Sequence, residues 1–158
     1  MKTYHHIDAS VFLELFMKLN RVGSQARECR EYLYYKLNKK NYNPKLSIFA
    51  LGEIVKTVSM MEIGKKSDIE QRRLGVFADL LKLINDKNID YWSPQFGCME
   101  KAIEVNNENY YKPADTLHVS CASQDPLCDT FVTIDKELLD SSTLEKKLKI
   151  KIKHPSVL

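Results

Sequence analysis

Short apolar runs alternate along the chain with longer segments in which apolar residues recur at helical spacing. The runs that predict strands are 4–7, 46–49, 89–92 and 131–134. A last segment, 148–153, alternates apolar residues with lysines, which is typical of an edge strand whose charged face discourages pairing with other chains. We therefore expect an α/β fold, a three-layer α/β/α sandwich with a central, mainly parallel sheet of four to five strands.

Helical segments are predicted between these strands, and three of them begin at recognisable signals. The signals are the capping box of Ser67 with Glu70, the pair Ser93-Pro94, and Pro113 after Lys112. The first helix is predicted from the spacing of Phe12, Leu15, Phe16 and Leu19. A further, basic helical segment is predicted at about 23–44, and it closes over the stretch Asn41 to Pro44.

The composition is that of one globular domain spanning residues 1–158. With 158 residues, 44% of them hydrophobic, the chain is long enough to bury a core. The net charge of +3 is too mild to identify a partner. No apolar run reaches the roughly 20 residues of a membrane span, and the N-terminus lacks a signal peptide, so we expect a cytoplasmic protein. Four scattered cysteines without a CxxC pair favour free thiols.

Four acidic residues stand where predicted strands end or predicted helices begin. Asp8 and Asp135 directly follow apolar strands. Glu53 and Asp115 fall near helix starts, and the helix dipole favours a carboxylate in the first turn. Ligands of open parallel sheets bind outside the carboxyl ends of the strands, so these acids can converge on one cleft. Clustered carboxylates repel one another unless a cation lies among them, and the pattern therefore predicts a site for Mg²⁺ or Mn²⁺.

Segments around these acids resemble, in order, the signature blocks of PIN-domain nucleases. The segments are 4–10 (YHHIDAS), 51–54 (LGEI), 114–122 (ADTLHVSCA) and 128–136 (CDTFVTIDK), and 150–157 resembles the C-terminal ending of the family. The catalytic metal ligands that the resemblance implies are Asp8, Glu53, Asp115 and Asp135, with Glu53 acting directly or through water. It also implies that the hydroxyl groups of Ser10 and Thr133 orient the site.

The resemblance further implies an activity and partners. It implies a metal-dependent endoribonuclease that hydrolyses RNA phosphodiester bonds and leaves a 3′-hydroxyl and a 5′-phosphate. Small members of this kind resemble VapC toxins, so an antitoxin protein and a homodimer are expected; the basic segment at about 23–44 keeps a housekeeping RNA-processing nuclease open. A non-catalytic PIN-like module that binds RNA or protein is the alternative. An aspartate-dependent phosphatase is disfavoured, because Ser10 stands where a second aspartate is required.

Other polar residues are better explained by structure than by catalysis. Asp129 precedes the last core strand and fits a turn hydrogen bond better than a metal bond. His5 and His6 fit structural positions in a strand, and His118 fits a hydrogen-bonded position at the edge of the core, although it lies one helical turn beyond Asp115. Residues 64–67 (GKKS) lack the first glycine of a P-loop, so an ATPase is not expected.

Overall fold

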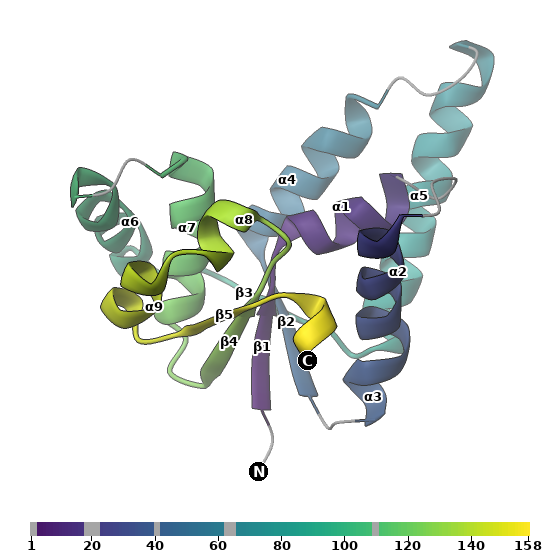
Figure 1. The fold of residues 1–158 in the computed structure, drawn as a ribbon. Helices are drawn as coiled ribbons and strands as arrows, with labels where there is room; N and C mark the ends of the chain where they lie inside the picture. The colour runs from purple at the N-terminus through teal and green to yellow at the C-terminus, as the bar shows by residue number, and fades with distance from the viewer. Residues whose placement is uncertain (1–2, 18–22, 40–41, 62–65, 109–110) are drawn as a thin grey trace.

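A computed structural model describes residues 3–17, 23–39, 42–61, 66–108 and 111–158, and its centre is a five-stranded parallel sheet (Figure 1). The strands are β1 (Thr3–Ile7), β2 (Tyr42–Ser47), β3 (Asp90–Trp92), β4 (Cys128–Val132) and β5 (Lys151–Lys153). They lie in the order β3-β2-β1-β4-β5, and every neighbouring pair is parallel. The prediction of a mainly parallel sheet of four to five strands is confirmed.

Helices cover both sides of this sheet. They are α1 (Ala9–Met17), α2 (Ser24–Glu31), a π-helix η1 (Tyr32–Lys36), α3 (Leu37–Lys39), α4 (Ile48–Ser59), α5 (Lys66–Asp86), α6 (Gly97–Glu108), α7 (Pro113–Ser123), α8 (Lys136–Leu139), α9 (Ser142–Leu148) and a 3-10 helix η2 (Pro155–Val157). Figure 1 shows α6, α7 and α9 on one side and α1, α2 and α5 on the other. The predicted three-layer α/β/α arrangement is confirmed.

Two buried apolar clusters fill the spaces between the layers. One joins β1, β2 and β4 to α1, α2, α4 and α5, and the other joins β4 and β5 to α6, α7, α8 and α9. Successive residues of β4 show the division, because Phe131 belongs to one cluster and Val132 to the other. Side chains of a strand alternate between faces, so a nearly continuous apolar run is needed where both faces are covered.

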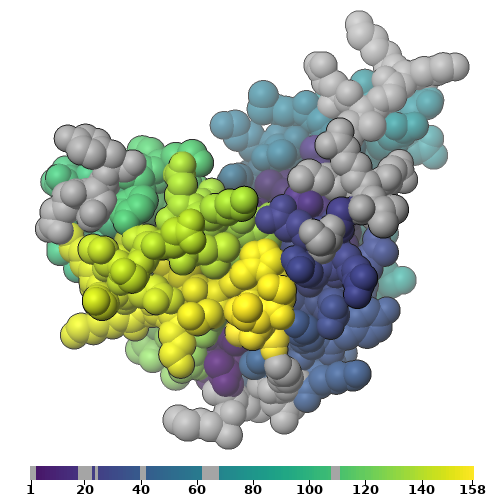
Figure 2. Space-filling view, viewed as in Figure 1, coloured from purple at the N-terminus to yellow at the C-terminus, as the bar shows by residue number. Residues whose placement is uncertain are grey.

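The C-terminal segment packs against the first helical layer. The ammonium group of Lys36 donates to the carbonyl oxygens of Pro155 and Ser156, each at 3.2 Å. Figure 2 shows this segment, in yellow, beside the dark blue helix α2. The basic segment predicted at about 23–44 is helical from Ser24 to Lys39, and residues 42–44 of its predicted closing stretch belong to β2. Pro44 lies inside β2, in register with His5 of β1.

Several element boundaries differ from the prediction for identifiable reasons. The strand predicted at 46–49 ends at Ser47, because the Ser47 hydroxyl caps α4 by accepting from the backbone N–H of Ala50 at 3.1 Å. The helix start predicted at Ser93-Pro94 is wrong, since the first turn bonds of α6 run from Cys98 and Met99 to Gln95 and Phe96.

The last two strands have other bounds than predicted. β4 ends at Val132, and Asp135 caps the next helix instead of closing the strand. Leu148 belongs to α9, which ends where Lys149 adopts a left-handed conformation with φ 54°, so β5 begins only at Lys151. β5 is an edge strand, as its lysine pattern predicted.

Other predictions can be compared with the structure only in part, because some of their residues lie outside the described ranges. The helix predicted through Ile84 is confirmed as α5, but Leu19 and the side chain of Ser67 lie outside the described residues, as do residues 64 and 65. None of the four cysteines forms a disulfide. Among the described residues, no helix is both long and apolar enough to cross a membrane.

Candidate metal centre

The four predicted acids lie at the carboxyl-end rim of the sheet, on four different elements. Asp8 follows β1, and its backbone N–H donates to the carbonyl of Val132 at 2.9 Å. Asp115 lies in the first turn of α7 behind Pro113, as predicted. Asp135 is the N-cap residue of α8. Glu53 lies in the second turn of α4 and not at its start, because Ser47 begins that helix earlier than the strand prediction allowed.

Asp8 is fixed by three side-chain donors. One carboxylate oxygen accepts from the hydroxyls of Ser10 at 2.5 Å and Thr133 at 2.8 Å. The other lies 3.0 Å from Nδ1 of His118. Burial alone would raise the pKa of Asp8, but these hydrogen bonds and the His118 charge together lower it below its usual value. Asp8 therefore stays ionised in a position where it is only 7% exposed.

His118 connects Asp8 to Glu53. Its Nδ1 faces Asp8, and its Nε2 lies 3.5 Å from Oε2 of Glu53. Burial would lower the pKa of His118, but the hydrogen bond to Asp8 and the neighbouring carboxylate charges raise it. Burial, with the charge of Asp8, raises the pKa of Glu53 against the opposing effect of His118. These three residues form the Asp8 group, whose ligand atoms lie within 4.8 Å of one another.

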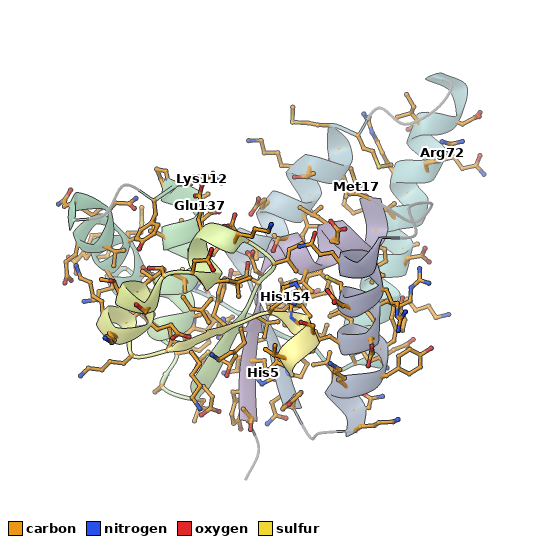
Figure 3. All side chains as sticks on the ribbon, in the orientation of Figure 1. His5, Met17, Arg72, Lys112, Glu137 and His154 are labelled. Atoms are coloured by element: carbon orange, nitrogen blue, oxygen red, sulfur yellow. The ribbon has the colours of Figure 1, made fainter. Side chains whose placement is uncertain are left out.

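Asp115 and Asp135 form a second group with Glu137, here called the Asp115 group, and its ligand atoms also lie within 4.8 Å of one another. Lys112, at the N-cap of α7, is its only cation among the described residues: the ammonium nitrogen lies 3.9 Å from Asp115, 3.8 Å from Asp135 and 3.5 Å from Glu137. Figure 3 shows Lys112 and Glu137 close together at the rim, far from His5 on β1. The side chain of Lys112 is 63% exposed, so water screens these pairs.

Asp115 is the least satisfied acid of the rim. Its Oδ2 is buried and has no hydrogen-bond partner among the described residues. Burial, followed by the charges of Asp135 and Asp8, raises the pKa of Asp115 to about 6. A buried carboxylate oxygen without a hydrogen bond, beside other carboxylates, fits a hard divalent cation, because Mg²⁺ and Mn²⁺ bind oxygen ligands and remove the repulsion between them.

The two groups adjoin each other through Thr133. Its hydroxyl donates to Asp8 and accepts from the backbone N–H of Asp135 at 3.1 Å. The charge of Asp8 also contributes to the raised pKa of Asp115. The structure thus brings Asp8 and Glu53 together in one group, and Asp115 and Asp135 together in the other, along one continuous rim.

The fold that builds this rim is shared with a solved structure. The chain is similar to the crystal structure of FitAcB from Neisseria gonorrhoeae, with a TM-score of 0.60, 18% sequence identity, and an alignment that covers 98% of this chain and 99% of that chain. At this identity, the likeness concerns the fold alone. No protein-family model matches the sequence, and no curated protein matches it.

Two members of the rim lie outside the predicted set of four acids. The sequence favours a hydrogen-bonded position at the edge of the core for His118, and it also allows an approach to the rim, because His118 stands three residues after Asp115 on the same face of α7. Glu137 follows Asp135 by two residues at the start of α8. Helical periodicity was the available signal for His118; for Glu137, only the tertiary fold brings its carboxylate to Asp115.

Three polar residues for which the sequence favours structural positions make contacts within the fold. Asp129 accepts from the backbone N–H of Tyr4 at 2.9 Å, which joins β4 to β1. His5 is buried on one face of β1, where its ring lies 4.0 Å from that of Tyr42 between centroids. His6 is buried on the other face and hydrogen-bonds Asp125 at 2.8 Å. None of these residues reaches the rim acids.

Proposed function

We propose that the protein is a metal-dependent endoribonuclease of the PIN type, which hydrolyses RNA phosphodiester bonds with Mg²⁺ or Mn²⁺ held at the rim. The observation that carries the proposal is the convergence of carboxylates around Oδ2 of Asp115, which is buried, accepts no hydrogen bond from the described residues and has only a long ion pair with Lys112, at 3.9 Å. The ordered PIN-like sequence blocks and the fold shared with FitAcB support it. The residues proposed to hold the cation are Asp8, Glu53, Asp115 and Asp135.

Each side chain has a distinct part in this proposal. Asp8, held by Ser10, Thr133 and His118, is the preorganised anchor, because its position and ionisation are fixed before any ligand arrives. Asp115 has an oxygen that needs a cation partner. When bound, the cation would lower the pKa of water and offset negative charge that develops on the phosphate.

Lys112 supplies positive charge at the same rim. Its ammonium group is exposed and lies beside the Asp115 group, where it reduces the repulsion that the carboxylates present to a polyanionic RNA. The same ammonium competes with a cation for the Asp115 group. Its charge is therefore expected to favour the approach of RNA and to oppose the binding of the metal.

The biological setting follows from the family resemblance. We propose a cytoplasmic protein that acts as the toxin of a toxin–antitoxin pair, is neutralised by an antitoxin protein and forms a homodimer. Four cysteines without a disulfide suit a reducing compartment. Co-expression with a small protein encoded next to it tests the pairing: growth arrest that the neighbour relieves supports a toxin, and growth unaffected by the protein alone favours a housekeeping RNA-processing nuclease.

The central test is cleavage by the purified protein. With Mn²⁺ and a panel of single-stranded and structured RNAs, we expect cleavage that chelator abolishes. Asp8→Asn should lower the rate at least about 100-fold, because it removes the anchor charge. Asp129→Asn is the matched control, since its carboxylate lies outside both groups.

The alternative outcomes separate the remaining functions. Equal rates for the parent and Asp8→Asn would show that any cleavage is contamination. RNA binding without cleavage, and without Mn²⁺ binding, would identify a non-catalytic module that keeps only the PIN-like fold.

A further inference from the structure

Glu53 has the most exposed side chain of the four predicted acids at the rim. Its side chain is 41% exposed, and α4 presents it toward solvent. Among the described residues, its ion-pair partner is Nε2 of His118, at 3.5 Å. The other nearby cation is Lys56, one turn further along α4, whose charge lowers the pKa of Glu53. The Glu53 carboxylate thus has two possible directions, toward the rim or toward Lys56 and water.

His118 is held in a position from which it can direct the Glu53 carboxylate toward the rim. It is 5% exposed and lies on α7, which packs against β4 and β2. The ring is rigid and carries a nitrogen on each of two edges, so one side chain contacts Asp8 and Glu53 at once. Because Asp8 is itself held by Ser10 and Thr133, its bond to Nδ1 fixes the orientation of the ring. Nε2 is then directed at Glu53.

We infer that His118 is a positioning residue of the proposed metal centre: it holds the carboxylate of Glu53 at the rim beside Asp8. This inference rests on the proposed function. It assigns a role to a histidine outside the predicted set of four acids, and it explains how an acid in the second turn of α4 joins a site built mainly from strand ends and helix starts. His118 acts through Glu53 and is not itself a catalytic residue.

Asparagine and glutamine substitutions at position 118 can each keep one of the two contacts that the His118 ring makes. The amide of asparagine occupies the place of Nδ1 and can donate to Asp8, whereas the amide of glutamine reaches the place of Nε2 and can donate to Glu53. His118→Asn should therefore lose the Glu53 contact, and His118→Gln should keep it. A residue needed only for packing would not distinguish these variants in this way.

The test is the dissociation constant for Mn²⁺, measured by electron paramagnetic resonance without RNA. His118→Ala and His118→Asn should each weaken Mn²⁺ binding about 10-fold, in the range found for residues that orient metal ligands, and His118→Gln should stay within about 3-fold of the parent. Glu53→Gln should also weaken binding about 10-fold. His5→Asn is the matched control, because His5 is a buried histidine of β1 without contact to the rim.

The double variant decides whether His118 acts through Glu53. If it does, His118→Ala combined with Glu53→Gln should bind Mn²⁺ about as weakly as Glu53→Gln alone, because the two changes remove one shared interaction. Losses that multiply to about 100-fold would mean that His118 contributes independently of Glu53, for example as a ligand, and would overturn the inference.

The remaining outcomes are equally decisive. A parent that binds Mn²⁺ no better than its His118 variants would overturn the inference alone, whereas a parent that binds no Mn²⁺ would contradict the proposed function as well. If His118→Ala does not fold, as judged by circular dichroism, the asparagine and glutamine variants carry the test, since each keeps one donor. Equal Mn²⁺ affinity of those two variants would overturn it.

Discussion

Two aspartates of this molecule, Asp125 and Asp115, differ in the donors that the protein supplies to their carboxylates. Asp125 accepts from Lys45 at 2.5 Å, from His6 at 2.8 Å and from the backbone N–H of Leu127 at 3.0 Å. These bonds lower its pKa, although burial would raise it. At the rim, Oδ2 of Asp115 has no such donor among the described residues.

The difference separates an acid that serves the fold from acids that fit a site. Around Asp125, the protein supplies a counter-charge in Lys45, which is itself only 8% exposed and lies over the rings of Tyr4 and Trp92. Around Asp115, the protein leaves negative charge in excess, with one exposed lysine opposite three carboxylates. An excess of negative charge among half-buried carboxylates is unfavourable without a cation, so the rim is where a ligand has the most to contribute.

The largest expected effect comes from breaking the structural cluster. Asp125→Asn removes the counter-charge of Lys45 and leaves a buried ammonium group unpaired, so the free energy of unfolding should fall by about 3 kcal/mol. Urea denaturation measures it. Adding Lys45→Met should restore much of the loss, since no unpaired charge then remains. A loss below about 0.5 kcal/mol in the single variant would mean that this cluster is no more important than a surface pair.

Removing charge from the rim should have the opposite sign. Asp115→Asn relieves repulsion by Asp135 and Asp8, so the free energy of unfolding in chelator should rise by about 1 kcal/mol. Mn²⁺ should stabilise this variant less than it stabilises the parent. Asp79→Asn, on the exposed face of α5, controls for the change in net charge. A loss of stability in chelator would contradict a repulsive rim.

The pH dependence of stability, compared between the parent and Asp115→Asn, tests the same repulsion. Because burial and neighbouring charges raise the pKa of Asp115 to about 6, from an ordinary value of 3.8, the folded state takes up a proton before the unfolded state does. Asp115 therefore destabilises the fold most at neutral pH, and this penalty declines as the pH falls from about 7 to about 4. Measured in chelator, the stability advantage of Asp115→Asn should shrink over that range.

Comparison within the pair removes the titrations of groups whose pKa does not depend on the charge of Asp115. Burial lowers the pKa of His5 to about 4, and it also lowers the pKa of His6, so both histidines make the fold less stable as the pH falls below about 6.5. They do so equally in the parent and in the variant. A stability difference that stays constant with pH would contradict the raised pKa of Asp115.

The smallest expected effect concerns the cation that the protein does supply to the rim. Lys112→Met removes the ammonium group beside the Asp115 group, so Mn²⁺ should bind about two- to five-fold more tightly at low ionic strength. The gain should decrease in added salt, which screens exposed charges. Lys146→Met, an exposed lysine of α9, is the control. Weaker binding would mean that Lys112 orders the carboxylates instead of competing for them.

The positions of the rim acids could be predicted where local sequence determines them. Asp8 follows an apolar run that is a strand, and Asp115 follows a proline that begins a helix, so each position depends on its own neighbours. The shift of Glu53 has another cause. Ile48 and Phe49 extend the apolar run of β2 beyond the strand, but they are 49% and 36% exposed on α4. The hydrophobicity of Ile48 and Phe49 therefore does not indicate burial in the sheet.

The bridging role of His118 could not be predicted, because it depends on distances between elements. Its neighbours in the sequence place it on the inner face of α7, but only the packing of that helix brings its ring between Asp8 and Glu53. The same holds for Asp125, which lies in a loop and pairs with residues of β1 and β2. Long-range polar contacts of this kind leave no periodic signal in the sequence.

The central place of β1 in the sheet has a consequence for how the protein is made. β1 is synthesised first, but its neighbour β4 and the donors His118 and Thr133 come from much later in the chain. On the ribosome, Asp8 therefore lacks two of its three side-chain donors until residues 118 and 133 have emerged, and only Ser10 is available to it before then. The rim of acids stays incomplete while most of this chain is being translated.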